Sequence, residues 1–188
     1  GATLKNTIKP GFQVGFGVER YMSRKLLIHI EAYLAYSKYL FLEEITYGNA
    51  RKYVSFSEKL YTVELPLTFS YEFTINKTHF ITRAGFSAAR ITGITGLPER
   101  KFDEDAQPIP GATQDISEYR KQMIYSGIVG AGVRYKVPRG IVYLDLRAKV
   151  GINNIVNSEK RIDNETVITN FHHIDDDFSL NTLSLSVG

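Results

Sequence analysis

The stretch YTVELPLTFSYEF at residues 61–73 places an apolar side chain at every odd position without interruption. Its even positions carry hydroxyl groups, a proline and two glutamates, Glu64 and Glu72. This alternation has the period of a β-strand, in which successive side chains point to opposite faces. The stretch therefore predicts a strand with one unbroken apolar face and one polar face that carries carboxylates.

The same alternation recurs along the chain, and we find no segment with the period of a helix. Predicted strands lie near residues 10–21, 26–38, 60–73, 78–91, 121–136, 141–152 and 178–188. Most are longer than the five or six residues typical of soluble sheets. They alternate between the tight turns MSRK, TINK and VPRG and long polar connections at 39–59, 92–120 and 153–177. We expect one all-β, antiparallel domain over residues 1–188.

The polar faces of these strands combine glycines with charged side chains, which distinguishes two architectures. In a soluble sandwich or a lipocalin-like barrel, these faces would form the outer surface. In a membrane barrel they face a narrow interior that side chains fill. Short turns at one rim and long loops at the other are typical of such barrels. The pattern predicts an up-and-down, eight-stranded transmembrane β-barrel.

Within such a barrel, the inward faces predict a set of ionic groups. Its members are Glu31, Glu64, Arg83, Arg134, Asp145 and Arg147. Charges without partners in a narrow bore would be costly, so an ion-pair network that fills the bore is the favoured interpretation. A gate or a proton path is the alternative. Pro66 removes one hydrogen bond from the strand ladder, and a bulge or a lumen water would satisfy the freed carbonyl.

The apolar faces predict two aromatic girdles, one at each membrane interface. Near the tight turns lie Tyr21, Tyr71, Phe73, Phe80 and Tyr135. Near the long loops lie Tyr36, Tyr61 and Tyr125. The chain contains 12 Tyr, 11 Phe and no Trp, so tyrosine and phenylalanine alone supply both girdles.

Composition excludes several kinds of function. There is no cysteine, which excludes disulfides, thiolate metal sites and cysteine nucleophiles. The net charge of +3 comes from interspersed charges, so nucleic acid is not an expected partner. His29 and Ser37 share a face but lie about 26 Å apart along one strand, and no catalytic triad assembles. We expect no enzyme activity and no cofactor. HHIDDD at 172–177 lacks a recognisable ligand spacing, so no metal site is predicted.

Three segments resemble the PorT-like outer-membrane β-barrel family of Bacteroidota. VELPLTFSYEF with HFITRAGFSAARI is similar to the strand pair that carries the family's leucine-proline motif. GFQVGFGVERYMSRKLLIHIEAYLAYSKYLF resembles its preceding hairpin, and IVGAGVRYKVPRGIVYLDLRAKVGINNI its glycine-rich pair. GATLKN resembles only the tail of the family's first strand, so we expect that strand to precede Gly1.

The resemblance implies a bacterial outer-membrane location, with the chain in its mature form, since GATLKNTIKPG lacks the pattern of a signal peptide. It implies contact with the lipid bilayer and lipopolysaccharide, and a complex with other outer-membrane or periplasmic proteins. The expected role is a membrane anchor and protein-interaction platform, as an accessory subunit of protein secretion of the type IX kind or of outer-membrane assembly. A small gated pore or a ligand-binding barrel is the alternative.

Overall fold

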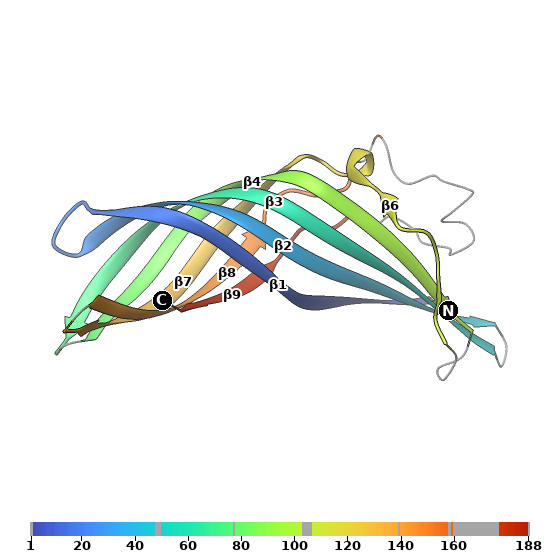
Figure 1. Cartoon of the computed structure of the whole chain (residues 1–188), viewed down its shortest axis with the longest axis horizontal. Helices are drawn as coiled ribbons and strands as arrows, with labels where there is room; N and C mark the ends of the chain where they lie inside the picture. Colours follow the sequence, from blue (N-terminus) through green and yellow to red (C-terminus); the bar gives the residue numbers. More distant parts are fainter. Residues whose placement is uncertain are drawn as a thin grey trace.

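The computed structural model describes residues 2–47, 50–76, 78–102, 107–138, 140–157, 159 and 177–187. In this part the chain is all-β, and its main strands form one antiparallel sheet that is curled into a half-barrel (Figure 1). The strands follow one another in chain order: β1 (Ala2–Tyr21), β2 (Leu26–Tyr47), β3 (Ala50–Ile75), β4 (Thr78–Lys101), β7 (Met123–Val137), β8 (Gly140–Gly151) and β9 (Thr182–Val187). The all-β, antiparallel prediction is confirmed.

Short elements complete the described part of the chain. The two-residue strands β5 (Ile109–Pro110) and β6 (Gln114–Asp115) pair with β4, and a 3-10 turn, η1, covers Ser117–Tyr119. None of the described segments is a helix of the length and apolar character needed to cross a membrane.

Strands β1, β2, β3 and β4 extend well beyond their predicted ends on the long-loop side. The expectation that GATLKN is the tail of a separate strand is wrong, because residues 2–6 continue β1 and pair with residues 41–45 of β2. The predicted irregular connection 39–59 is wrong, because β2 and β3 pair from Tyr39↔Glu58 up to Tyr47↔Ala50. The predicted connection 92–120 is also wrong at its start, since β4 continues to Lys101. The cause is a reversal of polarity. Beyond Tyr61, toward the long loops, β3 keeps its period, but its apolar side chains now point to the inner face of the sheet. On β4 a register shift beside Thr92 turns the even positions inward at this level.

The reversal is clearest on β3, where all even positions from Val54 to Glu72 are buried on the inner face. Toward the tight turns these inner residues are polar, as at Thr68 and Ser70. Toward the long loops they include Phe56 and Leu60, while Lys59 is exposed on the outer face. One strand therefore has a polar inner face at one end and a largely apolar inner face at the other.

An apolar core lies against the inner face of the sheet at the long-loop end. Residues after β6, after β8 and before β9 pack here against β3, β4 and β7. The buried cluster consists of Phe56, Leu60, Ala89, Ile91, Ile94, Ile116, Ile124, Ile155 and Leu180. A fully buried ion pair between Arg120 Nη2 and Glu58 Oε1 lies in the same region, with the guanidinium also 5.7 Å from the Phe178 ring centroid. This core caps the curled sheet at one end.

Pro66 interrupts the pairing of β3 with β2 without changing its register. The pairing runs up to Ile30↔Leu67 and resumes at Tyr33↔Glu64. On the other side, β3 pairs with β4 continuously through Pro66↔Ser87. No register shift accompanies the gap, so the proline is accommodated by a break in one ladder and not by a bulge.

Candidate functional site

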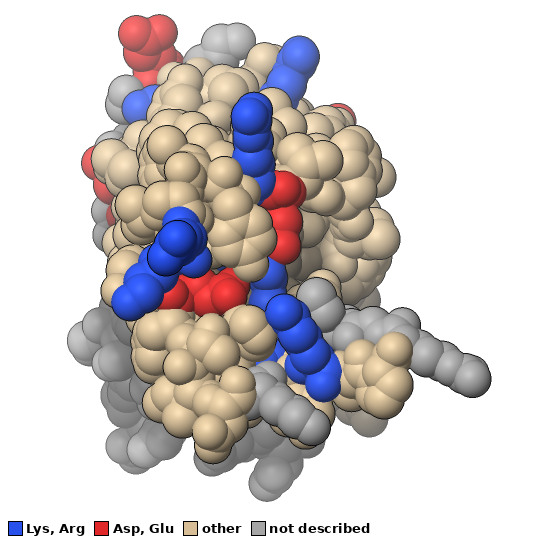
Figure 2. Space-filling view, turned by 90° about the vertical axis from the view of Figure 1, so that its left-hand side faces the viewer, with Lys and Arg blue, Asp and Glu red and all other residues tan. Residues whose placement is uncertain are grey.

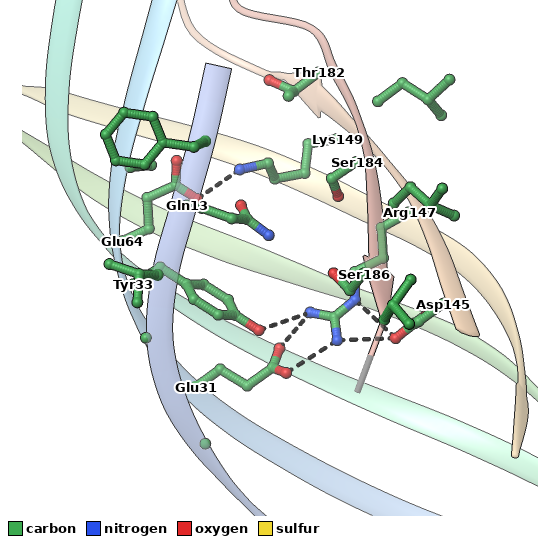
Figure 3. Close-up of a pocket in the computed structure, with 18 of the residues that line it drawn as sticks. Gln13, Glu31, Tyr33, Glu64, Asp145, Arg147, Lys149, Thr182, Ser184 and Ser186 are labelled. Carbon is green, nitrogen blue, oxygen red and sulfur yellow. Dashed lines mark hydrogen bonds and ion pairs between the residues drawn. The ribbon is translucent and has the colours of Figure 1, made fainter. Parts of the chain in front are cut away.

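A charged cluster centred on Arg147 lies on the inner face of the curled sheet (Figure 3). The guanidinium makes a bidentate contact with Glu31, with Nη1–Oε2 at 2.6 Å and Nη2–Oε1 at 3.0 Å. Its Nε and Nη2 donate to Asp145 Oδ2 at 3.1 and 2.9 Å. The Tyr33 hydroxyl accepts from Nη1 at 3.2 Å. Arg147 is therefore held from two sides by carboxylates.

The curvature of the sheet is what makes this contact possible. Glu31 lies on β2 and Arg147 on β8, four positions apart in the strand order. In a flat sheet these strands would be about 19 Å apart, at about 4.8 Å per strand. A direct ion pair at 2.6 Å requires the inner faces of β2 and β8 to approach each other across the bore.

Arg83 on β4 extends the cluster through Asp145. Its Nη2 lies 2.8 Å from Asp145 Oδ2, and both side chains are about 95% buried, with exposed fractions of 4% and 5%. Gly130 on β7 provides the space, since a Cβ there would lie 2.8 Å from the Leu146 carbonyl oxygen and 3.1 Å from Arg83 Cγ. The glycine thus allows two long arginine side chains to lie side by side. Two guanidiniums and two carboxylates form one linked, charge-balanced unit.

A second ion pair lies nearer the long-loop end. Lys149 Nζ on β8 is 2.6 Å from Glu64 Oε2 on β3, and Thr62 donates to the other oxygen of Glu64 at 3.4 Å (Figure 3). This pair also bridges the bore. It stabilises the curl at a second level of the sheet.

Further ionic contacts lie toward the tight-turn end. Arg134 makes a bidentate contact with Glu19 on β1, at 2.9 and 2.5 Å, and His29 Nδ1 is 3.4 Å from the same carboxylate. Glu72 is 2.7 Å from His79 Nδ1 and accepts from the Tyr21 hydroxyl at 3.1 Å. Figure 2, viewed from this end, shows acidic side chains near the middle of the face, flanked by basic ones.

The inner face is not uniformly polar at this level. Leu27, Ile81 and Ile128 are also buried there.

Of the six predicted ionic residues, four form the linked cluster: Glu31, Arg83, Asp145 and Arg147. The other two, Glu64 and Arg134, pair with residues outside the predicted set. Their partners are Lys149 and Glu19. Both partners stand at inward-facing positions of their strands, so the alternation of the sequence could have identified them as inner residues. The register alone does not reveal which of these residues meet across the bore.

The aromatic residues lie on the outer face at the predicted ends of the strands. Tyr36 and Tyr61 are adjacent near the long-loop end, with ring centroids 5.1 Å apart, and Tyr36 also contacts Phe12 at 5.4 Å. Near the tight turns, Phe73 stacks on Phe80 at 5.3 Å. Largely exposed on this face are Tyr21, Tyr71, Tyr125 and Tyr135.

No group of three or more metal-ligating side chains gathers within the described residues. The run HHIDDD lies outside them except for Asp177, and part of the charged segment ERKFDED at 99–105 does as well. A cavity of about 1150 Å³ opens on the inner side between β1, β8 and β9, next to the cluster around Arg147. On β9 its lining alternates between the hydroxyl-bearing Thr182, Ser184 and Ser186 (Figure 3) and apolar residues.

Comparison with protein-family models, with curated proteins and with solved structures finds no match for this chain. The class is therefore defined by the fold and the site alone. The chain is an all-β, barrel-like protein, with an antiparallel sheet curled around ionic side chains.

Proposed function

We propose that this chain is an outer-membrane β-barrel protein that acts without catalysis, as a membrane anchor and a platform for other proteins. The observation that carries the proposal is the inverted polarity of the sheet. Its outer face exposes large apolar side chains on successive strands, among them Phe12, Phe16, Leu34, Leu65, Phe69, Leu146 and Val150. Its inner face holds buried ion pairs. Large exposed apolar surfaces mark membrane or protein contacts.

The height of the apolar band supports a bilayer as the contact. On β3 the band runs from Tyr61 to Phe73, twelve residue steps, or about 40 Å along the strand. With a tilt of about 45°, this length gives a band about 28 Å tall, close to the ~25 Å of transmembrane barrels. The reversal of polarity above Tyr61 is what a strand that leaves lipid and enters water would require.

The barrel is proposed to close through an eighth strand. The seven strands in the described order alternate in direction, so the edges β1 and β9 run the same way. Direct pairing of β1 with β9 would be parallel, whereas one additional strand would be antiparallel to both. Closure is needed in lipid, because each unpaired backbone group there costs several kcal/mol. Single-chain bacterial barrels also have even strand numbers.

The ion pairs across the bore favour an anchor over a transport pore. They lie at the levels of Arg147 and Lys149, and the apolar core around Ile94 lies at the long-loop end. A barrel whose bore is crossed in this way is expected to interact with partners through its surface and loops. Together with the PorT-like pattern, this supports an accessory role in protein secretion of the type IX kind or in outer-membrane assembly.

The cavity of about 1150 Å³ favours the alternative of a small gated pore or ligand-binding barrel. Single-channel conductance in planar bilayers separates the two. A silent membrane supports the anchor, and discrete openings that change in Arg147→Gln support the pore.

Cysteine labelling tests the membrane assignment directly, because the chain has no native cysteine. Leu65→Cys and Leu146→Cys lie on the apolar band, and Lys59→Cys lies above it as the matched control. In lipid vesicles, a water-soluble maleimide should label the control and leave the two band positions unreacted. Rapid labelling of Leu65→Cys and Leu146→Cys in folded, reconstituted protein would refute the proposal.

A further inference from the structure

Basic residues border the apolar outer face at its long-loop end. On β2, β3 and β4, and in the segment just before β7, the second position beyond the apolar stretch is a lysine or an arginine. Lys38 follows Tyr36, Lys59 precedes Tyr61, Arg90 follows Ala88, and Lys121 precedes Met123. These four residues are called the basic collar: Lys38, Lys59, Arg90 and Lys121.

The collar concentrates like charges. Lys38 lies directly opposite Lys59 in the β2–β3 register. Like charges in directly opposed positions are destabilising. Within the described residues, Lys38, Lys59 and Arg90 form no ion pair. Asp115, on β6 nearby, accepts from the Ser117 backbone N–H instead. The charge of the collar therefore suits an anion from outside the chain.

A groove of about 740 Å³ lies between β3, β4 and the start of β7, and Arg90 of the collar is part of its lining. Its lower part is lined by Val63, Leu65, Ala88 and Met123. The small Ala88 lies between Leu65 and Tyr125 in the register, so the outer surface is hollowed there. The upper part is lined by Arg90 with Thr92, Ser117 and Gln122. An apolar groove with a cationic, hydroxyl-bearing end matches a molecule with an acyl chain and an anionic head.

We propose that this groove binds an anionic membrane lipid, with the lipid phosphate on Arg90 and an acyl chain along Val63 and Leu65. This inference rests on the proposed membrane location. Lys121 lies two residues before Met123, the register partner of Arg90, and adds attraction for the same headgroup. Each basic residue near a lipid surface contributes about a fivefold preference. Arg90 suits this role because its planar guanidinium can bind a phosphate through two hydrogen bonds.

Fluorescence quenching tests the proposal, because the chain has no tryptophan. Leu65→Trp places one reporter in the groove, and Leu146→Trp places a matched reporter on the apolar face of β8, away from the groove. Each protein is reconstituted into vesicles that contain brominated phosphatidylglycerol or brominated phosphatidylcholine. The ratio of quenching by the two lipids measures the local preference for the anionic one.

We expect the ratio of quenching by the anionic lipid to quenching by phosphatidylcholine to be about five or more at Leu65→Trp. At Leu146→Trp we expect a ratio near one. Adding Arg90→Gln should bring the groove value close to one, and Arg90→Lys should keep most of it. Equal preferences at the two reporters, or a groove preference that Arg90→Gln leaves unchanged, would overturn the lipid site alone. Absence of quenching at both positions by either lipid would overturn the membrane location as well.

Discussion

Replacing Asp145 by asparagine tests whether the inner charges form one balanced unit. The cluster holds two guanidiniums, of Arg83 and Arg147, and two carboxylates, of Glu31 and Asp145. Asp145 contacts both arginines, at 2.8 and 2.9 Å, and is 4% exposed. Asp145→Asn therefore leaves two buried cations with one carboxylate.

The expected cost follows from the burial. Removing one partner of a buried ion pair typically destabilises a protein by about 3–5 kcal/mol, because the remaining charge is uncompensated. Arg83→Gln creates the opposite imbalance, two carboxylates with one cation, and should be costly for the same reason. The double variant Arg83→Gln/Asp145→Asn restores balance, with the Glu31–Arg147 pair intact. We expect it to be more stable than the sum of the single effects by about 2–3 kcal/mol.

Urea unfolding of the reconstituted protein, followed by circular dichroism, gives the four free energies of unfolding. Lys136→Gln, at an exposed position beside a tight turn, serves as the charge-removal control and should change stability by less than about 0.5 kcal/mol. If the double variant loses as much stability as the two single variants together, the cluster is not a coupled unit and the reasoning fails.

Three further predictions test packing and protonation. Gly130→Ala should cost about 1–3 kcal/mol of unfolding free energy because its Cβ would meet the Leu146 carbonyl, whereas Gly127→Ala, with open space around it, should cost nothing measurable. Ile94→Ala, in the core at the long-loop end, should cost about 2–5 kcal/mol in the same assay, against less than about 0.5 for the exposed Lys59→Ala. Hydrogen bonds from the Ser117 side chain and backbone lower the pKa of Asp115. An NMR titration should therefore find the pKa of the Asp115 carboxyl below that in an unfolded peptide, and the stability it adds should be lost as pH falls through the folded value.

The strands and their inward residues could be predicted from the sequence because the parity of a strand is a local property. Alternation assigns Glu31, Asp145 and Arg147 to the same side of the sheet without any knowledge of the fold. The pairs between Glu19 and Arg134, and between Glu64 and Lys149, could not be predicted in the same way. They depend on how tightly the sheet curls, which is set by the packing of all strands together.

The extensions of β2, β3 and β4 were missed for a different physical reason. A search for strands with an apolar outer face finds a strand only where the medium outside the sheet is apolar. On β3 the parity continues through Leu60 and Phe56, but the apolar residues change from odd to even positions. On β4 a register shift beside Thr92 turns the even positions inward, so Phe86 lies on the outer face and Ile94 lies in the core.

The apolar residues of a strand move from odd to even positions when the medium on its two faces changes along its length. At each point of the strand, apolar side chains are more stable on the less polar face. A soluble sheet keeps water on one side along its whole length and has no reason to reverse. In this chain the outer face changes between Lys59 and Tyr61 on β3 and between Ala88 and Arg90 on β4. Arg90 pairs with Val63, so the change on β4 lies four residues nearer the tight turns than Lys59. The reversal, the aromatic residues and the collar all mark the long-loop end of the apolar band, as expected if the proposed membrane surface lies near this end.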